Sequence, residues 1–168
     1  MRRSVFALCI GLLPGFLSTP LAAQPGCFGA GQPLFHCRAD GKTVDLCLQG
    51  DVVLYRFGPA GGAADLLLAR SAREVGMRPW AGIGRYLSEE VTLRNAAYSY
   101  TVHYSVDRLA EGAPQAEGRV VVRQGEHVLA DLTCAAGSLS AHDFYPVFEA
   151  KEAAGQCWSR ADAAWGAC

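Results

Sequence analysis

The sequence predicts a mainly β protein, an antiparallel β-sandwich or small β-barrel of roughly seven or eight strands with a short C-terminal helix, stapled by disulfides. Two patterns and the composition support this prediction. Between residues 35 and 134, short apolar or alternating runs are separated by turn residues about every 10 positions. The chain also carries seven cysteines, and 51% of its 168 residues are apolar while 18% are charged, as in a globular domain.

The clearest expected strand is residues 98–106, where aromatic or apolar side chains alternate with polar ones. This period of two places the larger side chains on one face, namely Tyr98, Tyr100, Val102, Tyr104 and Val106. Similar runs predict strands at residues 34–38, 43–49, 52–57, 65–70, 90–94, 118–123 and 126–134. Asp40-Gly41 is the strongest hairpin signal among the links between them.

A short helix is expected at residues 143–154. Asp143 is a suitable N-cap, Pro146 then falls in the first turn, and Gly155 ends the helix. The tail from the helix to residue 168 shows no clear pattern.

Residues 1–23 have the three parts of a secretory signal peptide. Arg2 and Arg3 form the basic start, residues 5–17 the apolar centre, and Ala22-Ala23 the small-residue end. Cleavage after Ala23 leaves residues 24–168 as a single secreted β domain. The apolar centre is shorter than the roughly 20 residues of a membrane helix, so no membrane span is expected after cleavage. The expected location is periplasmic or secreted.

Cleavage also changes the charge balance. It removes two arginines and no acid, so 13 basic and 16 acidic side chains remain, with a formal charge of −3. This charge argues against a nucleic-acid partner. The chain contains neither a Gly-x-Ser-x-Gly motif nor a phosphate-binding loop. We therefore predict no catalytic residue and no cofactor.

Six cysteines remain after cleavage, and their even number predicts up to three disulfides: Cys27, Cys37, Cys47, Cys134, Cys157 and Cys168. Cys27 is expected to pair with Cys168, because the ends of a domain are often close in space. A tight turn at Asp40-Gly41 places Cys37 opposite Val44, which makes a direct Cys37–Cys47 bridge awkward without a bulge. The alternative joins each of these two to Cys134 or Cys157. No Cys-x-x-Cys or Cys-x-x-His spacing occurs in the mature chain, so no metal site is predicted.

None of the four histidines shows close ligand spacing: His36, His103, His127 and His142. His127 and Asp131 stand four apart on an expected strand and would share a face. Such a couple either orients a general base or forms an ordinary surface hydrogen bond. A small hydrolase with a site built from His103, His127 and nearby acids is therefore one alternative function.

The most distinctive irregular stretch is residues 78–86. It supplies the candidate binding residues, which are Arg78, Trp80, Gly82, Gly84, Arg85 and Tyr86. Arginine, tryptophan and tyrosine in loops on a β scaffold are typical of recognition surfaces, although the aromatic side chains could instead cap the sheet. The leading expectation is an exported, non-catalytic binding protein acting through this loop. An envelope structural or stress-protection protein is a further alternative.

Two motifs bear on the partner: Phe35-His36-Cys37 followed by Asp40-Gly41, and Ala81-Gly82-Ile83-Gly84-Arg85-Tyr86. Together they resemble the layout of bacterial periplasmic inhibitors of C-type lysozyme, over residues 35–105. The resemblance implies a small exported β-barrel whose loop enters the lysozyme cleft, where Arg85 would present a cation to the catalytic carboxylates. The chain differs from that family at Ala81, where the family has serine, and by one missing residue before Arg85. It also has more cysteines and a C-terminal helical extension.

Overall fold

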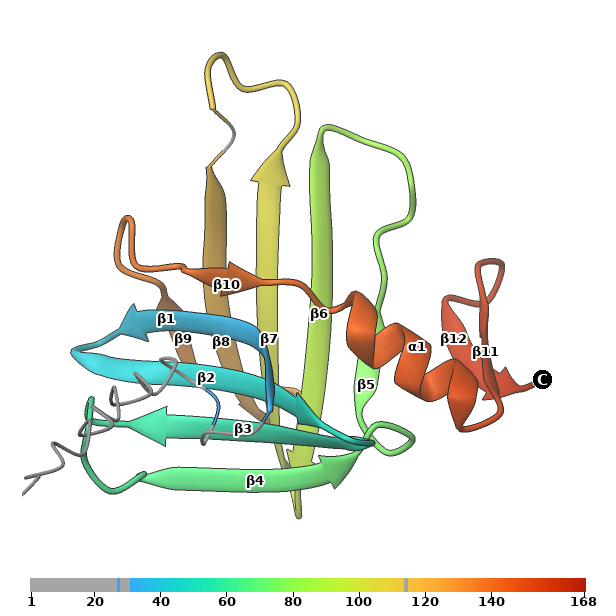
Figure 1. Ribbon diagram of the computed structural model, residues 1–168, viewed down its shortest axis with the longest axis horizontal. Coiled ribbons are helices and arrows are strands. Elements are labelled where there is room, and N and C mark those ends of the chain that lie inside the picture. Colours follow the sequence, from blue (N-terminus) through green and yellow to red (C-terminus); the bar gives the residue numbers. More distant parts are fainter. Residues whose placement is uncertain (1–26, 28–30, 114) are drawn as a thin grey trace, which may run out of the picture.

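A computed structural model describes residues 27, 31–113 and 115–168 of the chain. Two antiparallel five-stranded sheets dominate it, and their strands cross one another in Figure 1. The first sheet has the order β10 (Ala141–His142), β1 (Gln32–Ala39), β2 (Lys42–Gln49), β3 (Val52–Gly58) and β4 (Leu66–Ser71). The second has the order β5 (Gly76–Arg78), β6 (Tyr86–Asn95), β7 (Tyr98–Asp107), β8 (Ala116–Gln124) and β9 (His127–Thr133).

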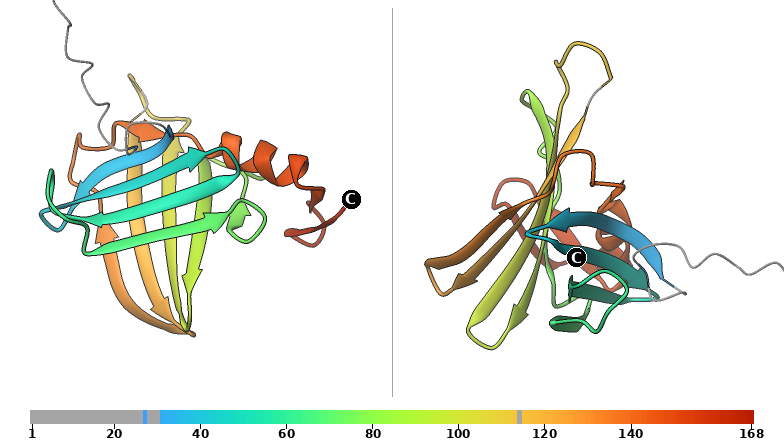
Figure 2. Two further views of the ribbon diagram at one scale, coloured as in Figure 1. Left: turned by 60° about the horizontal axis from the view of Figure 1, so that its bottom comes forward. Right: turned by 90° about the vertical axis from the view of Figure 1, so that its left-hand side faces the viewer.

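The first sheet lies in front of the second in the left view of Figure 2, and the inner faces form one hydrophobic core. The fully buried members of this core come from both sheets and include Phe35, Leu46, Tyr55, Val91, Val102 and Val120. The predicted β-sandwich is confirmed, and the sheets do not close into a barrel. All eight expected strands are present, whereas β5, β10 and the hairpin of β11 (Gln156–Ser159) and β12 (Ala164–Ala167) were not predicted.

The predicted hairpin at Asp40-Gly41 is confirmed. Both residues have positive φ, 50° and 71°, which is the conformation that a two-residue type I′ turn requires. The turn sets the register between β1 and β2, so Cys37 lies opposite Val44 as expected. The same register places His36 opposite Asp45.

Helix α1 (Tyr145–Ala153) confirms the short C-terminal helix. Pro146 lies in its first turn, and Gly155 follows its end with φ of 79°. The N-cap residue is Phe144 rather than Asp143, because the buried Phe144 ring anchors the helix start in the core. The Asp143 carboxylate still accepts a hydrogen bond from the Tyr145 N–H at 3.0 Å. In the described part of the chain, no helix is long and apolar enough to span a bilayer.

All six predicted cysteines form disulfides, in the pairs Cys27–Cys47, Cys37–Cys134 and Cys157–Cys168. The expected Cys27–Cys168 bridge is wrong. Cys168 follows β12, which pairs with β11 and brings it to Cys157, with the two Cα atoms 5.0 Å apart. Cys27 instead lies over β2. The Cys37–Cys134 bridge, one of the alternatives left open, joins β1 of the first sheet to the end of β9 in the second. The expected signal peptide, residues 1–23, lies outside the described residues.

Candidate functional site

Two loops extend beyond the same end of the second sheet (Figure 1): the loop between β5 and β6, and the loop that follows β7. Arg85 donates to the carboxylate of Asp107 from Nε at 2.9 Å and from Nη2 at 2.6 Å. The backbone N–H of Arg108 donates to the carbonyl of Arg85 at 3.0 Å. We call residues 79–86 and 107–110 the tip, because these bonds hold the two segments side by side.

The tip exposes large side chains to solvent. Ile83 is 79% exposed, Leu109 is 71% exposed and Tyr86 is 54% exposed. The Arg85 side chain is also more than half exposed, although it is bonded to Asp107. Exposed apolar and aromatic groups next to arginine form the kind of surface that binds proteins.

Local contacts fix the conformation of the β5–β6 loop. Trp80 donates from Nε1 to the carbonyl of Ile83 at 3.3 Å, and the Arg108 guanidinium lies 4.7 Å from the centre of the Trp80 ring. Gly82 and Gly84 have φ of 84° and 95°, in the left-handed region where a β-carbon is unfavourable. The two glycines are therefore required by the shape of the loop.

Five of the six predicted binding residues lie in the tip, and Arg78 does not. Arg78 belongs to β5 and forms an ion pair with Glu90 of β6 at 3.3 Å. Tyr86 does not cap the sheet, since its ring is largely in solvent, whereas Trp80 is half-buried.

Arg85 and Asp107 stabilise each other's charged form. Hydrogen bonding to Asp107 raises the pKa of Arg85, and hydrogen bonding from Arg85 lowers the pKa of Asp107. Both groups are therefore charged at neutral pH. The bidentate pair restricts how the arginine is presented at the surface.

A pocket of about 380 Å³ lies between the β5–β6 loop, α1 and β11. Four aromatic side chains line it: Trp80, Tyr145, Phe148 and Trp158. Glu152 of α1 and Arg160, which follows β11, also line it. We call this space the aromatic pocket. Its volume is within the range of small-ligand sites.

Trp165 supports the aromatic pocket from behind. Its ring centre lies 4.9 Å from that of Phe148 and 5.6 Å from that of Trp158. Its Nε1 donates to the carbonyl of Met77 at 2.6 Å, which attaches the C-terminal hairpin to β5. Sequence analysis missed this arrangement because the tail showed no clear pattern. The signal that could have found it was two tryptophans on either side of a short polar segment, since Trp158 pairs directly with Trp165.

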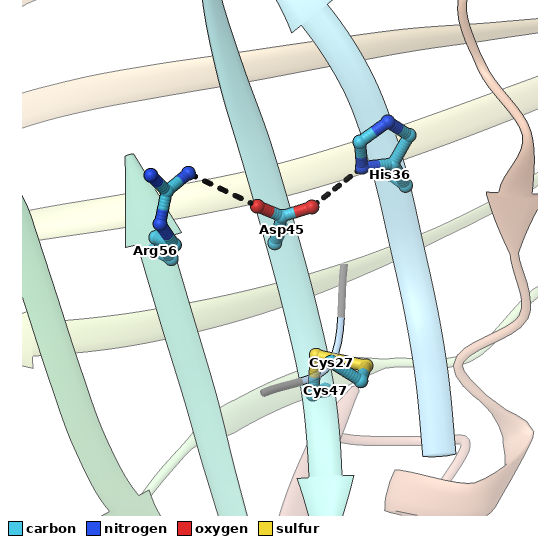
Figure 3. Close-up of a disulfide and its surroundings, with 5 residues drawn as sticks. All are labelled: Cys27, His36, Asp45, Cys47 and Arg56. Atoms are coloured by element: carbon cyan, nitrogen blue, oxygen red, sulfur yellow. Dashed lines mark hydrogen bonds and ion pairs between the residues drawn. A yellow bond between two sulfur atoms is a disulfide. The ribbon is translucent and has the colours of Figure 1, made fainter. Parts of the chain in front are cut away.

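Apart from the tip and the aromatic pocket, a polar cluster lies on β1, β2 and β3 (Figure 3). His36 Nδ1 lies 2.5 Å from Oδ1 of Asp45, and Arg56 donates to Oδ2 of Asp45 at 3.4 Å. Asp45 is buried, and its two partners compensate the cost of burying a carboxylate. Arg56 also donates to the carbonyls of Pro59 and Gly62, which orders the β3–β4 connection. Among the described residues, no side-chain hydroxyl or thiol is hydrogen bonded to His36, while the Thr43 hydroxyl accepts a hydrogen bond from Arg56 at 2.7 Å.

The predicted sharing of a face by His127 and Asp131 is wrong. His127 lies opposite Gln124 and Asp131 opposite Val121, because a bulge at Leu129 breaks the alternation of β9. Asp131 instead forms an ion pair with Arg119 of β8.

His103 lies in the middle of the second sheet, between Glu90 of β6 and Arg119 of β8. Burial lowers its pKa, and the Arg119 charge acts in the same direction, while Glu90 opposes them.

Within residues 27, 31–113 and 115–168, no three histidine, cysteine or acidic side chains are grouped to hold a metal ion. No protein-family model, curated protein or solved structure matches the chain.

Proposed function

We propose that the protein is an exported, non-catalytic binding protein that engages another protein through the tip. The observation that carries this proposal is the cluster of exposed side chains on two mutually bonded loops, Ile83, Tyr86 and Leu109 beside Arg85. Aromatic and arginine side chains contribute much of the energy of protein interfaces. Loops that are already ordered lose less conformational entropy when they bind.

Export to the periplasm or beyond is part of the proposal. Three disulfides are formed, and disulfides persist mainly in oxidising compartments. The signal-like start of the sequence favours the same location.

The most specific form of the proposal is inhibition of a C-type lysozyme. It is favoured by the place of Gly82-Ile83-Gly84-Arg85-Tyr86, the segment that carries the resemblance, at the exposed tip. Arg85 is held by Asp107, so an arginine that enters a lysozyme cleft would exchange this carboxylate for the enzyme's own. The test measures lysozyme activity on bacterial cell walls with residues 24–168 and with the Arg85→Ala variant. Inhibition that Arg85→Ala abolishes supports this form, and no inhibition at micromolar protein contradicts it.

Photo-crosslinking tests the broader proposal. A photoreactive residue is placed at position 83 or 109 in the tip, and at position 67 or 129 as a control. Leu67 and Leu129 are matched controls because they are 56% and 53% exposed and lie outside the tip. We expect one protein adduct of defined mass from the two tip positions only.

Absence of an adduct at the tip, or the same adducts from the control positions, would contradict a tip-directed partner. That result, together with normal cell survival of alanine variants in the tip, would favour the envelope structural alternative.

A further inference from the structure

The aromatic pocket offers both flat apolar walls and charged hydrogen-bonding groups. Trp80, Phe148 and Trp158 are half-buried around it, and Tyr145 lies at its exposed side. Tyr145 and Phe148 stack with ring centres 5.8 Å apart and an angle of 8° between their planes. Trp80 and Trp158 come from segments about 80 positions apart in the sequence, so the pocket exists only because the hairpin attaches to β5.

Two side chains of opposite charge line this pocket. Glu152 and Arg160 both line it and both are exposed. Among the described residues, neither side chain has an ion-pair or hydrogen-bond partner. The Arg160 guanidinium reaches toward the β5–β6 loop, since Nη1 lies 3.8 Å from where a β-carbon on Gly82 would be. The pocket therefore presents one unpaired acceptor and one unpaired donor group above aromatic walls.

This combination selects against ligands with a single charge. An anion would meet Glu152, and a cation would meet Arg160. A neutral ligand with several hydroxyl groups can donate to the carboxylate and accept from the guanidinium at once. The apolar C–H face of such a ligand can pack on an aromatic ring.

We propose that the aromatic pocket binds a short neutral saccharide. Its sugar rings stack on Trp80 and Trp158, and its hydroxyl groups bond to Glu152 and Arg160. The tip and the pocket share Trp80. The assignment still does not depend on the protein partner proposed for the tip, because the exposed side chains Ile83, Arg85 and Leu109 do not line the pocket.

The test titrates full-length mature protein, residues 24–168, with chitotriose, cellotriose and maltotriose. Indole N–H resonances report the site, because two of the three tryptophans line the pocket while Trp165 donates to the Met77 carbonyl behind it. We expect at least one saccharide to shift the Trp80 and Trp158 resonances in a saturable way, and the Trp165 resonance much less.

Two exposed substitutions keep the test independent of folding. Glu152→Gln and Arg160→Gln are each expected to weaken saccharide binding about tenfold, the effect of losing one hydrogen bond to a charged group. Glu149→Gln is the matched control, because Glu149 is exposed on the same helix and does not line the pocket. It is expected to leave the affinity unchanged.

Three results would overturn the proposal. One is the absence of a saturable shift with any saccharide up to about 10 mM, which would place the Kd above that concentration. Another is that the Glu149→Gln control weakens saccharide binding as much as Glu152→Gln and Arg160→Gln do. The third is stronger binding of phenylalanine, tetramethylammonium or benzoate than of the saccharides, which would assign the pocket to a zwitterion, a cation or an anion. The tip crosslinks are unaffected by these results, so the two proposals fail separately.

Discussion

Among single residues, Gly118 shows how closely the two sheets pack. A β-carbon at this position of β8 would lie 2.5 Å from Sγ of Cys134 and 2.9 Å from Cζ of Phe35. Both neighbours are fixed, Cys134 by its disulfide to Cys37 and Phe35 by complete burial in the core. Glycine is therefore required here because there is no room for a β-carbon, and not because of its backbone conformation.

Gly118→Ala is expected to lower the free energy of unfolding by about 1–3 kcal/mol, the usual cost of overpacking. It should also hinder formation of the Cys37–Cys134 bridge. Denaturant unfolding and a count of free thiols measure the two effects. Gly166→Ala is the control, since a β-carbon at Gly166 would meet no atom within 4 Å beyond its chain neighbours. Equal stability of the two variants would contradict the packing argument.

His103 makes stability depend on pH. Because burial lowers its pKa in the folded state below the ordinary value of about 6.5, the unfolded chain binds a proton first as pH falls. The contribution of His103 to stability is therefore present above about pH 6.5 and is lost as pH falls through its folded-state pKa.

We expect wild-type protein to lose more thermal stability than His103→Gln between about pH 7.5 and about pH 5. Thermal unfolding of both proteins across this range measures the difference. The other three histidines are common to both, so they cancel in the comparison. Parallel curves for the two proteins would show that His103 contributes nothing to the pH dependence.

Among the secondary-structure elements, α1 is attached to the rest of the molecule by a buried lysine. Lys151 Nζ donates to the carbonyls of Ala72 at 3.1 Å and Val75 at 2.8 Å, and it lies 5.0 Å from the centre of the Trp165 ring. Burial lowers the pKa of Lys151. The lysine joins helix α1, the turn before β5 and the C-terminal hairpin, and of these the helix and the hairpin line the aromatic pocket.

Lys151→Met is expected to lower the free energy of unfolding by about 2–4 kcal/mol, because it leaves buried carbonyls without a donor. The Trp158 and Trp165 fluorescence should change with it. Lys42→Met is the matched control, since Lys42 forms an exposed ion pair with Asp65 at 2.8 Å. If Lys151→Met lowers the free energy of unfolding no more than Lys42→Met does, Lys151 does not attach the helix as described.

At the scale of the complete fold, two of the three disulfides connect very different parts of the molecule. Cys37–Cys134 joins the two sheets across a sequence separation of 97, while Cys157–Cys168 closes a hairpin across a separation of 11. A crosslink that closes a longer loop removes more entropy from the unfolded chain. The bridge between the sheets should therefore dominate global stability, and the hairpin bridge should mainly order the aromatic pocket.

Replacing Cys37 and Cys134 by alanine is expected to cost about 4.7 kcal/mol, and replacing Cys157 and Cys168 about 2.8 kcal/mol, by loop-closure entropy alone. Chemical denaturation of the two double variants measures this order. The hairpin variant should also shift the Trp158 indole resonance, which the other variant leaves in place. The reverse order of stability would show that local packing outweighs loop closure.

Local sequence patterns were enough to predict the eight main strands and one register of this protein. The alternation over residues 98–106 and the turn chemistry of Asp40-Gly41 are local properties, so they do not depend on the rest of the chain. The same turn also placed His36 opposite Asp45, a pairing that the sequence contained and that we did not extract from it. Five of the six candidate binding residues were found because glycines and aromatic residues mark an unusual loop.

Which distant segments meet depends on the tertiary packing alone. The partner of Cys37, the bulge at Leu129 that separates His127 from Asp131, and the position of Trp80 and Trp158 around one pocket all depend on how the sheets and the hairpin pack. These contacts join positions far apart in sequence, and no local pattern specifies their pairing. The physical reason is that burial of apolar surface is non-directional: it requires that the faces be covered, and the shape of the packed protein selects what covers them.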